Sequence, residues 1–161
     1  MTIAGLGAPV PLTADHDTEH FTCKHGSLTS WLQKRALANS TSGASRTYVV
    51  CDPIRRVVGF YALAAGSIAS ESVPGRLRRN MPDPLPVIVL GRLAVHADWA
   101  GRGLGSGLLR DALLRSIQAA ELIGARALLC HAVDVEAAAF YARNGFAPSP
   151  LEPLTLLVGL R

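Results

Sequence analysis

The stretch that decides the fold is Leu93-Ala-Val-His-Ala-Asp-Trp-Ala-Gly-Arg-Gly-Leu-Gly-Ser106. It joins a β-rich run to an amphipathic helical pattern. Its glycines let the backbone approach a ligand closely and expose successive N–H groups. The first turn of the following helix adds unsatisfied donors and the positive end of the helix dipole, so a diphosphate is a fitting ligand. A glycine-rich turn alone is equally compatible with a tight connection that binds nothing.

Two common phosphate-binding motifs do not describe this stretch. A dinucleotide-binding turn needs Gly-x-Gly-x-x-Gly, whereas the glycines here alternate from Gly101 to Gly107. A P-loop needs a Gly-Lys-Ser/Thr ending, which is absent. The kind of phosphate-containing ligand that this stretch could bind therefore has to be inferred from the rest of the sequence.

Working outward, the hydrophobic periodicity predicts alternating helices and strands. Ser27 is expected to cap a helix with Trp31 on its apolar face, and 39–43 reads as a loop. The expected strands are 46–51, 56–63, 87–90 with 93–95, 127–132 and 154–158, and the expected later helices run from Leu104 to about Gly124 and from Asp134 to about Asn144. Four prolines between residues 66 and 86 predict a loop or short helix there. This order gives an α/β layered domain.

Composition limits the class of protein. The chain has 161 residues, of which 49% are hydrophobic and 17% are charged, so we expect one globular domain over residues 1–161. Three scattered cysteines with no CxxC pair argue against a disulfide framework or a zinc site. No signal peptide or membrane span is evident, which predicts a cytoplasmic protein. The net charge of +4 permits an anionic partner without requiring one.

Two segments resemble the hallmarks of the GNAT superfamily of N-acetyltransferases. Residues 100–105 resemble its Gln/Arg-x-x-Gly-x-Gly/Ala turn, and Ala139-Phe-Tyr-Ala-Arg-Asn-Gly-Phe146 resembles its later aromatic-Tyr-x-x-x-Gly-Phe turn. Both stand in the family's order. The chain departs at Ala100, where the family usually has Gln or Arg, so one usual pyrophosphate contact is missing and Arg102 is the nearest source of positive charge.

The resemblance implies a GNAT acyl-CoA N-acyltransferase fold, with a mixed central sheet flanked by helices, and acetyl-CoA as cosubstrate without a metal. The strand at 93–95 would pair with the pantetheine arm, and the amides after it would hold the diphosphate. Tyr141 would protonate the leaving thiolate as general acid, whereas Phe140 reads as a core aromatic. The expected acetyl-CoA residues are Leu93, Ala94, Val95, Ala100, Gly101, Arg102, Gly103, Leu104, Gly105 and Ser106.

A narrower resemblance covers nearly the whole chain. Phe21-x-Cys23, Leu28-x-x-Trp31-Leu32 and Gly75-Arg-Leu-Arg-Arg-Asn-Met-Pro-Asp-Pro84 resemble the GNAT toxins of bacterial toxin–antitoxin systems. Such toxins acetylate the α-amine of aminoacyl-tRNA and so block translation, pair with a ribbon-helix-helix antitoxin, and several are homodimers. Arginine suits bidentate phosphate contact, so cations could hold the acceptor stem. The candidates are Arg76, Arg78, Arg79, Lys34, Arg35 and Arg92.

Two other functions stay open at this point. The enzyme could acetylate a small amine, such as an aminoglycoside or polyamine, which predicts an acidic acceptor cleft. The chain could instead be a non-catalytic module that binds acyl-CoA, or DNA with an antitoxin, in which case Tyr141 would be dispensable. No carboxylate stands out as a general base, and His96 and His131 are candidates by residue type only.

Overall fold

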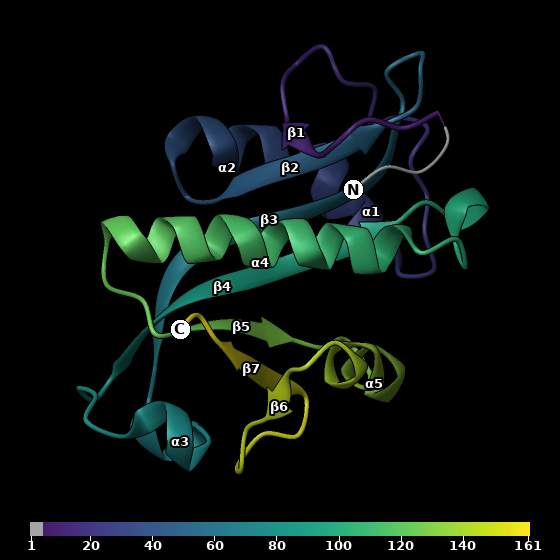
Figure 1. The fold of residues 1–161 in the computed structure, drawn as a ribbon. Coiled ribbons are helices and arrows are strands. Elements are labelled where there is room, and N and C mark those ends of the chain that lie inside the picture. The colour runs from purple at the N-terminus through teal and green to yellow at the C-terminus, as the bar shows by residue number, and fades with distance from the viewer. Residues whose placement is uncertain (1–4) are drawn as a thin grey trace. The chain divides into compact units, whose positions relative to one another are not determined.

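The computed structural model describes residues 5–161, and its contacts group the chain into two compact units. Of the described residues, the first unit comprises 5–64 and 92–112, and the second comprises 65–91 and 113–161. Hydrogen bonds order the strands β1-β2-β3-β4-β5-β7-β6 in a mixed seven-stranded sheet (Figure 1). The expected α/β architecture with a mixed sheet is therefore confirmed. The elements are β1 (Val10–Pro11), α1 (Gly26–Lys34), α2 (Ala36–Ser42), β2 (Arg46–Cys51), β3 (Val57–Ile68), α3 (Gly75–Arg78), β4 (Leu85–Val95), α4 (Leu104–Leu122), β5 (Ala127–His131), α5 (Val135–Arg143), β6 (Ala147–Pro148) and β7 (Thr155–Gly159).

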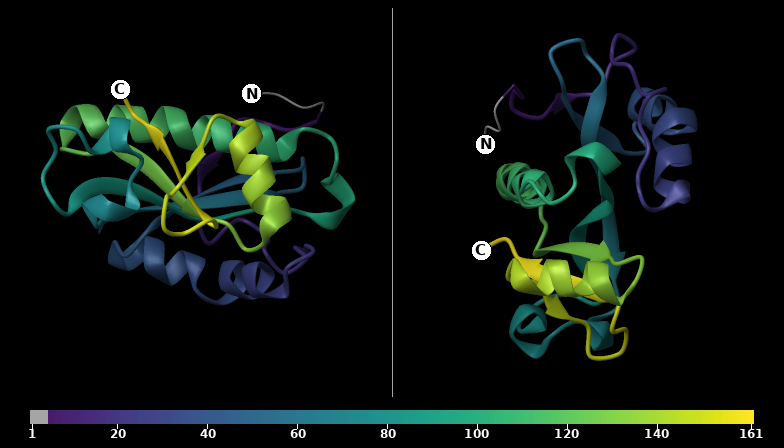
Figure 2. Two further views of the ribbon diagram at one scale, coloured as in Figure 1. Left: turned by 90° about the horizontal axis from the view of Figure 1, so that it is seen from below. Right: turned by 90° about the vertical axis from the view of Figure 1, so that its right-hand side faces the viewer.

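The first unit is built on an antiparallel β1-β2-β3 arrangement. Helices α1 and α2 lie on one side of β2 and β3 (Figure 2). Buried side chains from these elements form one apolar cluster, in which the Phe21 and Phe60 rings meet edge to face at 5.4 Å. On β3, a Cβ added to Gly59 would lie 3.0 Å from Leu108 and 3.2 Å from Leu104. Glycine therefore allows the first turns of α4 to pack closely on β3.

The second unit contains a parallel pair and two antiparallel pairs. Residues Val87–Leu90 of β4 pair in parallel with Ala127–Cys130 of β5, and β5 pairs antiparallel with β7. Helix α5 begins as expected, because the Asp134 carboxylate accepts a hydrogen bond from the Ala137 amide at 2.8 Å. Such a cap contributes about 1 kcal/mol. The helix ends at Arg143, and Gly145 follows the C-cap residue Asn144 with a φ of 94°, which favours glycine.

Two predictions near the N-terminus are wrong. Ser27 does not cap α1, because the chain turns earlier and the His25 carbonyl accepts bonds from the amides of Leu28 and Thr29. Residues 39–42 are helical and not a loop. Within α2, Thr41 Oγ1 donates to the Leu37 carbonyl and Ser42 Oγ donates to the Asn39 carbonyl, while Ser40 Oγ accepts from the Thr47 amide of β2. Gly43 ends the helix with a φ of 86°.

The proline-rich segment is only partly as expected. A single-turn 3₁₀ helix at Ser70–Ser72 and the four-residue α3 occupy its middle, in agreement with a loop or short helix. Strand β3, however, continues to Ile68, and β4 begins at Leu85 and runs through Arg92 without interruption. Within residues 5–161, no helix is both long and apolar enough to cross a membrane.

Candidate active site

The glycine-rich loop belongs to the first unit, and its shape depends on two glycines. Gly101 and Gly103 have φ values of 77° and 82°, in the left-handed region that favours glycine. A Cβ added at either position would meet no heavy atom within 4 Å, so the space beside each Cα is open and both glycines are exposed. Helix α4 starts immediately afterwards at Leu104. The loop thus presents backbone amides and a helix start to one exposed region, which is the arrangement that suits a diphosphate.

Side chains of the loop divide into anchors and exposed groups. Leu104 is 1% exposed and anchors the helix start in the core, so only its backbone can face a ligand. The Arg102 guanidinium lies 4.7 Å from the centre of the Trp99 ring, a cation–π contact that orients it. Arg102 forms no ion pair with any residue in the described range, so its charge is available to an anion where Ala100 supplies none.

The segment of β4 that precedes the loop lies beyond the last residue pair between β4 and β5. Pairing between β4 and β5 stops at Leu90 and Cys130, although β4 continues to Val95. Residues 93–95 therefore follow the paired part of the strand, where we expect the pantetheine arm. Of the three, Ala94 is buried in the apolar cluster of the first unit.

His96 follows this segment, and the structure gives it a structural role. Its Nδ1 accepts a hydrogen bond from the Asp98 amide at 3.0 Å, and its Nε2 lies 3.0 Å from the His20 carbonyl oxygen. An accepting Nδ1 leaves the proton on Nε2, which donates to that carbonyl. Both ring nitrogens are therefore occupied, and His96 holds the turn before the loop.

Tyr141 belongs to the second unit and lies on α5. It is 7% exposed, and its ring contacts Phe140 at 5.2 Å and Phe146 at 5.5 Å. Burial and the nearby Cys130 thiol raise the pKa of Tyr141 well above its usual value. The phenol therefore stays protonated at neutral pH, as a proton donor must. Its hydroxyl has no hydrogen-bond partner within residues 5–161.

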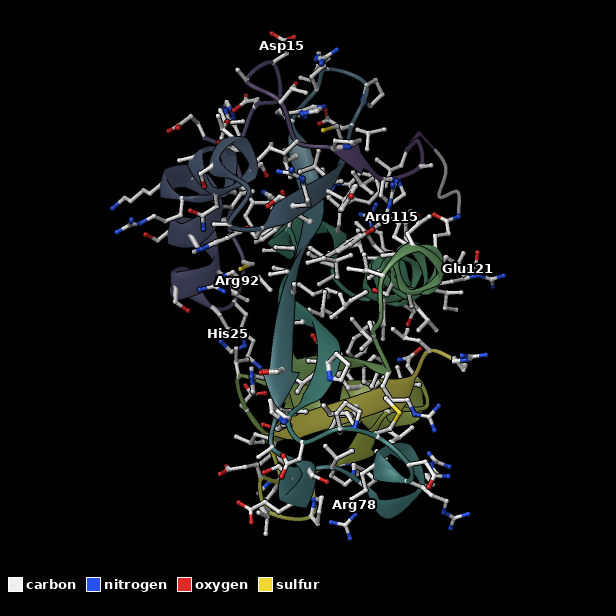
Figure 3. The ribbon with its side chains drawn as sticks, turned by 90° about the vertical axis from the view of Figure 1, so that its left-hand side faces the viewer. Asp15, His25, Arg78, Arg92, Arg115 and Glu121 are labelled. Atoms are coloured by element: carbon white, nitrogen blue, oxygen red, sulfur yellow. The ribbon has the colours of Figure 1, made fainter. Side chains whose placement is uncertain are left out.

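Two sets of the predicted RNA-binding cations lie on separate units. Arg76, Arg78 and Arg79 surround α3, and Figure 3 shows Arg78 projecting outward. Leu77 is buried beneath them in the core of the second unit. Arg126 caps α3 by donating from Nε to the Leu77 carbonyl at 3.0 Å. The α3 arginines are thus exposed on a firmly held turn.

The remaining cations are on the first unit. Lys34 and Arg35 are exposed where α1 meets α2. Arg92, labelled in Figure 3, is half-buried on β4. Its guanidinium lies 4.6 Å from the centre of the Trp31 ring. The Trp31 ring in turn stacks on Phe60 at 6.1 Å. The contact between Arg92 and Trp31 could not be predicted from the sequence, because the two residues are 61 positions apart along the chain.

A small cavity of about 80 Å³ also lies in the first unit and was not predicted. Its lining includes His20, Asp52, Arg56, His96 and Trp99. The Asp52 carboxylate there is paired with the Arg56 Nε at 2.8 Å. An acidic cleft for a small polyamine does not arise from this lining, because its two carboxylates, Asp52 and Asp98, share it with a guanidinium and two histidines. No group of three or more His, Cys, Asp or Glu side chains in the described part of the chain could hold a metal ion.

Comparison with known proteins agrees with this geometry. The family model for the acetyltransferase (GNAT) domain matches residues 43–148. A tRNA-acetylating toxin of Mycobacterium tuberculosis is 53% identical over 156 residues, which cover 97% of this chain and 93% of that protein. A solved structure of AtaT complexed with acetyl-methionyl-tRNAfMet is 26% identical, with a TM-score of 0.89, and covers 96% of this chain and 94% of its own.

A second solved structure contains a tyrosine-to-phenylalanine mutant of the AtaT toxin bound to the C-terminus of the antitoxin AtaR and acetyl-CoA. It is 25% identical, has a TM-score of 0.83, and covers 97% of this chain and 94% of that one. The family model covers well over half of the residues. The chain therefore belongs to the GNAT acetyltransferase family.

Proposed function

We propose that this protein is a toxin that transfers the acetyl group of acetyl-CoA to the α-amine of aminoacyl-tRNA and so blocks translation. The observation that carries the proposal is the 53% identity, over 97% of the chain, to a tRNA-acetylating toxin. The similarity to AtaT complexed with acetyl-methionyl-tRNAfMet supports the same acceptor. The family model spans residues of both units, and we take residues 1–161 as a single GNAT domain.

In this proposal, acetyl-CoA is held mainly by backbone. Residues 93–95 extend past the β4–β5 ladder and offer the peptide groups that β5 leaves unpaired to the pantetheine arm. The amides of 101–106 and the start of α4 receive the diphosphate, with Arg102 in place of the family's residue at position 100. These roles are supported by the positive φ values and open surroundings of Gly101 and Gly103.

The chemistry in this proposal requires a neutral acceptor amine and a protonated leaving thiolate. Esterification of an amino acid lowers the pKa of its α-amine, so a large neutral fraction is present near neutral pH. The Tyr141 phenol, kept protonated by burial, donates its proton to the departing sulfur. The α3 arginines together with Lys34, Arg35 and Arg92 neutralise phosphates of the acceptor stem.

The partners and the setting are part of the proposal. The similarity to an AtaT mutant bound to the C-terminus of AtaR supports an antitoxin partner, which we propose to be of the ribbon-helix-helix type. We further propose a homodimer that acts in the cytoplasm, where charged tRNA is found.

The test is protein synthesis in a cell-free extract supplied with acetyl-CoA. The wild-type protein should stop synthesis, and omission of acetyl-CoA or the Tyr141→Phe substitution should restore it. The cognate antitoxin, added in purified form, should also relieve the block. Unimpaired synthesis with folded wild-type protein would contradict the toxin function.

A further inference from the structure

The second unit contains a histidine at the point where two strands separate. The ladder between β4 and β5 ends at Leu90 and Cys130, and His131 is the next and last residue of β5. Its side chain is exposed, whereas the residues before it on the strand are buried. Exposed side chains directly beyond the end of a parallel ladder are well placed to meet a ligand.

His131 and Tyr141 belong to opposite faces of β5. The Cys130 thiol is close enough to Tyr141 to raise its pKa, so Tyr141 is on the Cys130 face of the strand. Leu129 instead packs with Leu77 of α3 in the apolar cluster of the second unit. Because successive side chains of a strand alternate, His131 shares the Leu129 face and points away from Tyr141.

The space on the His131 face is open. On β4, Gly91 follows Leu90, the last residue paired with β5. A Cβ built on Gly91 meets no heavy atom within 4 Å. By the same alternation, Gly91 lies on the face of Val89, which packs against the cluster that contains Leu129. A small acceptor group could therefore reach this edge next to His131.

A neighbouring strand orients the imidazole ring. Thr155 of β7 lies opposite His131 in the register, is 7% exposed, and places its Oγ1 3.0 Å from the His131 Nδ1. In the tautomer whose Nδ1–H donates to this oxygen, Nε2 presents its lone pair outward. Within residues 5–161, Nε2 has no hydrogen-bond partner, and no carboxylate or cation forms an ion pair with the ring. The titratable groups of the opposite face are Cys130 and Tyr141, and Asp134 is engaged with the Ala137 amide.

We propose that His131 accepts the proton of the acceptor amine, on the face of β5 opposite the proton donor Tyr141; the inference rests on the proposed acetyl transfer. The amine nitrogen forms the new bond to the thioester carbonyl carbon, and the carbon–sulfur bond breaks. The nitrogen loses one proton to His131 Nε2, and the sulfur gains one from the Tyr141 hydroxyl. Solvent then takes the proton from His131 and returns one to Tyr141, so that neither residue is changed.

This assignment agrees with the chemistry of the acceptor. An amine that attacks a thioester becomes strongly acidic as its lone pair is used, so a weak base suffices to remove its proton. The neutral imidazole of histidine has a nitrogen lone pair that accepts a proton, and histidine is the side chain that most often acts as a general base. The base then acts on the nitrogen from one face of the strand, and the acid acts on the sulfur from the other.

The test compares His131→Gln with a matched His20→Gln control, using acetyl-CoA with two acceptors: total charged tRNA, and an amino-acid methyl ester as a small amine of low pKa. His131 and His20 are both exposed, so neither substitution disturbs the core. We expect His131→Gln to lower kcat about 100-fold with KM for acetyl-CoA unchanged, and His20→Gln to leave both unchanged. The loss should shrink at alkaline pH, where hydroxide can take the proton from the attacking amine in place of His131, and added imidazole should restore part of the rate.

A second variant separates orientation from proton transfer. Thr155→Val should lower kcat by about tenfold, less than His131→Gln, with the shape of the pH profile retained. The inference would be overturned if the wild type is active and the kcat of His131→Gln stays within about threefold of the wild-type value at every pH. That result would leave the proposed function standing. Activity on the ester alone, lost in His131→Gln, would support the inference and contradict the tRNA acceptor. No activity of the wild type on either acceptor would overturn both.

Discussion

The glycine-rich loop of the first unit is exposed and offers backbone groups, whereas the Tyr141 region of the second unit is buried and offers one side chain. Residues 100–103 are exposed, and the loop takes its shape from left-handed glycines. Tyr141 is buried among aromatic rings, and this burial together with the nearby Cys130 thiol raises the pKa of its hydroxyl. In the proposed function, the loop therefore contributes binding through its backbone, whereas Tyr141 contributes chemistry through one side-chain atom. Substitutions in the two regions should consequently change different kinetic constants.

The largest effect is expected for Tyr141→Phe. The change removes only a hydroxyl that no described protein group uses, so the aromatic packing stays and the free energy of unfolding should change little. Loss of the proton donor should lower kcat by about 100-fold or more. Steady-state kinetics with acetyl-CoA and charged tRNA measure kcat, and denaturant unfolding measures the stability. Equal kcat for the variant and the wild type would remove Tyr141 from the chemistry.

A substitution in the glycine-rich loop should instead change the affinity for acetyl-CoA. Gly103→Val forces a β-branched residue into a φ of 82°, which costs about 1–3 kcal/mol and shifts the amides. Acetyl-CoA affinity should fall by about tenfold or more, since 1.4 kcal/mol is a factor of ten. Gly124→Ala is the control, because that glycine has open surroundings and an ordinary φ. Unchanged affinity in Gly103→Val, measured by calorimetry, would argue against backbone binding of the diphosphate.

A smaller effect, confined to the acceptor, is expected for the α3 arginines. Replacing Arg76, Arg78 and Arg79 by Gln should raise KM for charged tRNA several-fold and leave acetyl-CoA affinity unchanged. The dependence of KM on salt should also weaken, by roughly 0.7 in the logarithmic slope for each phosphate that is no longer neutralised. The control replaces three exposed arginines elsewhere, Arg110, Arg143 and Arg161. Identical salt dependence in both triple variants would mean that the α3 arginines are only a solvated surface.

The smallest effect concerns pH and stability. Burial raises the pKa of the Asp52 carboxyl, but the Arg56 amide and guanidinium, which donate to it at 3.0 and 2.8 Å, outweigh burial and hold that pKa below its usual value. A lowered folded-state pKa contributes stability above the unfolded-state pKa, and this contribution is lost as pH falls through the folded-state pKa. Asp52→Asn should therefore lower the free energy of unfolding by about 1 kcal/mol at neutral pH.

That difference should disappear in acid, when Asp52 is protonated in the wild type. Denaturant unfolding at neutral and acidic pH checks both points. The Tyr141 region should contribute no such acid sensitivity, because the pKa of Tyr141 is raised and burial raises the pKa of Cys130 to about 12. Equal losses at both pH values would show that Asp52 acts through packing and not through its charge.

Much of the fold could be predicted because its signals are local. The cap at Asp134, the stop at Gly145 and the periodicity of α4 each depend on residues within a turn or two of one another. The predictions failed where tertiary packing outweighed local preference. Burial of Ala36 and internal bonding of hydroxyls made α2 helical where a polar loop was expected.

The candidate site divides in the same way. Gly101 and Gly103 could be recognised because left-handed backbone needs glycine, and Tyr141 because its spacing to Gly145 matches a family turn. The contacts of Arg92 with Trp31 and of His131 with Thr155 join residues far apart in sequence. No periodicity or spacing carries such information, so the order of the Arg92 side chain and the direction of the His131 ring come from the structure alone.

The most direct test of the central claim is mass analysis of total charged tRNA after incubation with the protein and acetyl-CoA. The account predicts aminoacyl groups heavier by one acetyl, released on ester hydrolysis as N-acetylamino acids, and their absence with Tyr141→Phe. The amino acid that carries the acetyl group would also identify the accepted tRNA. Unmodified aminoacyl groups in the presence of folded, acetyl-CoA-binding wild-type protein would contradict it.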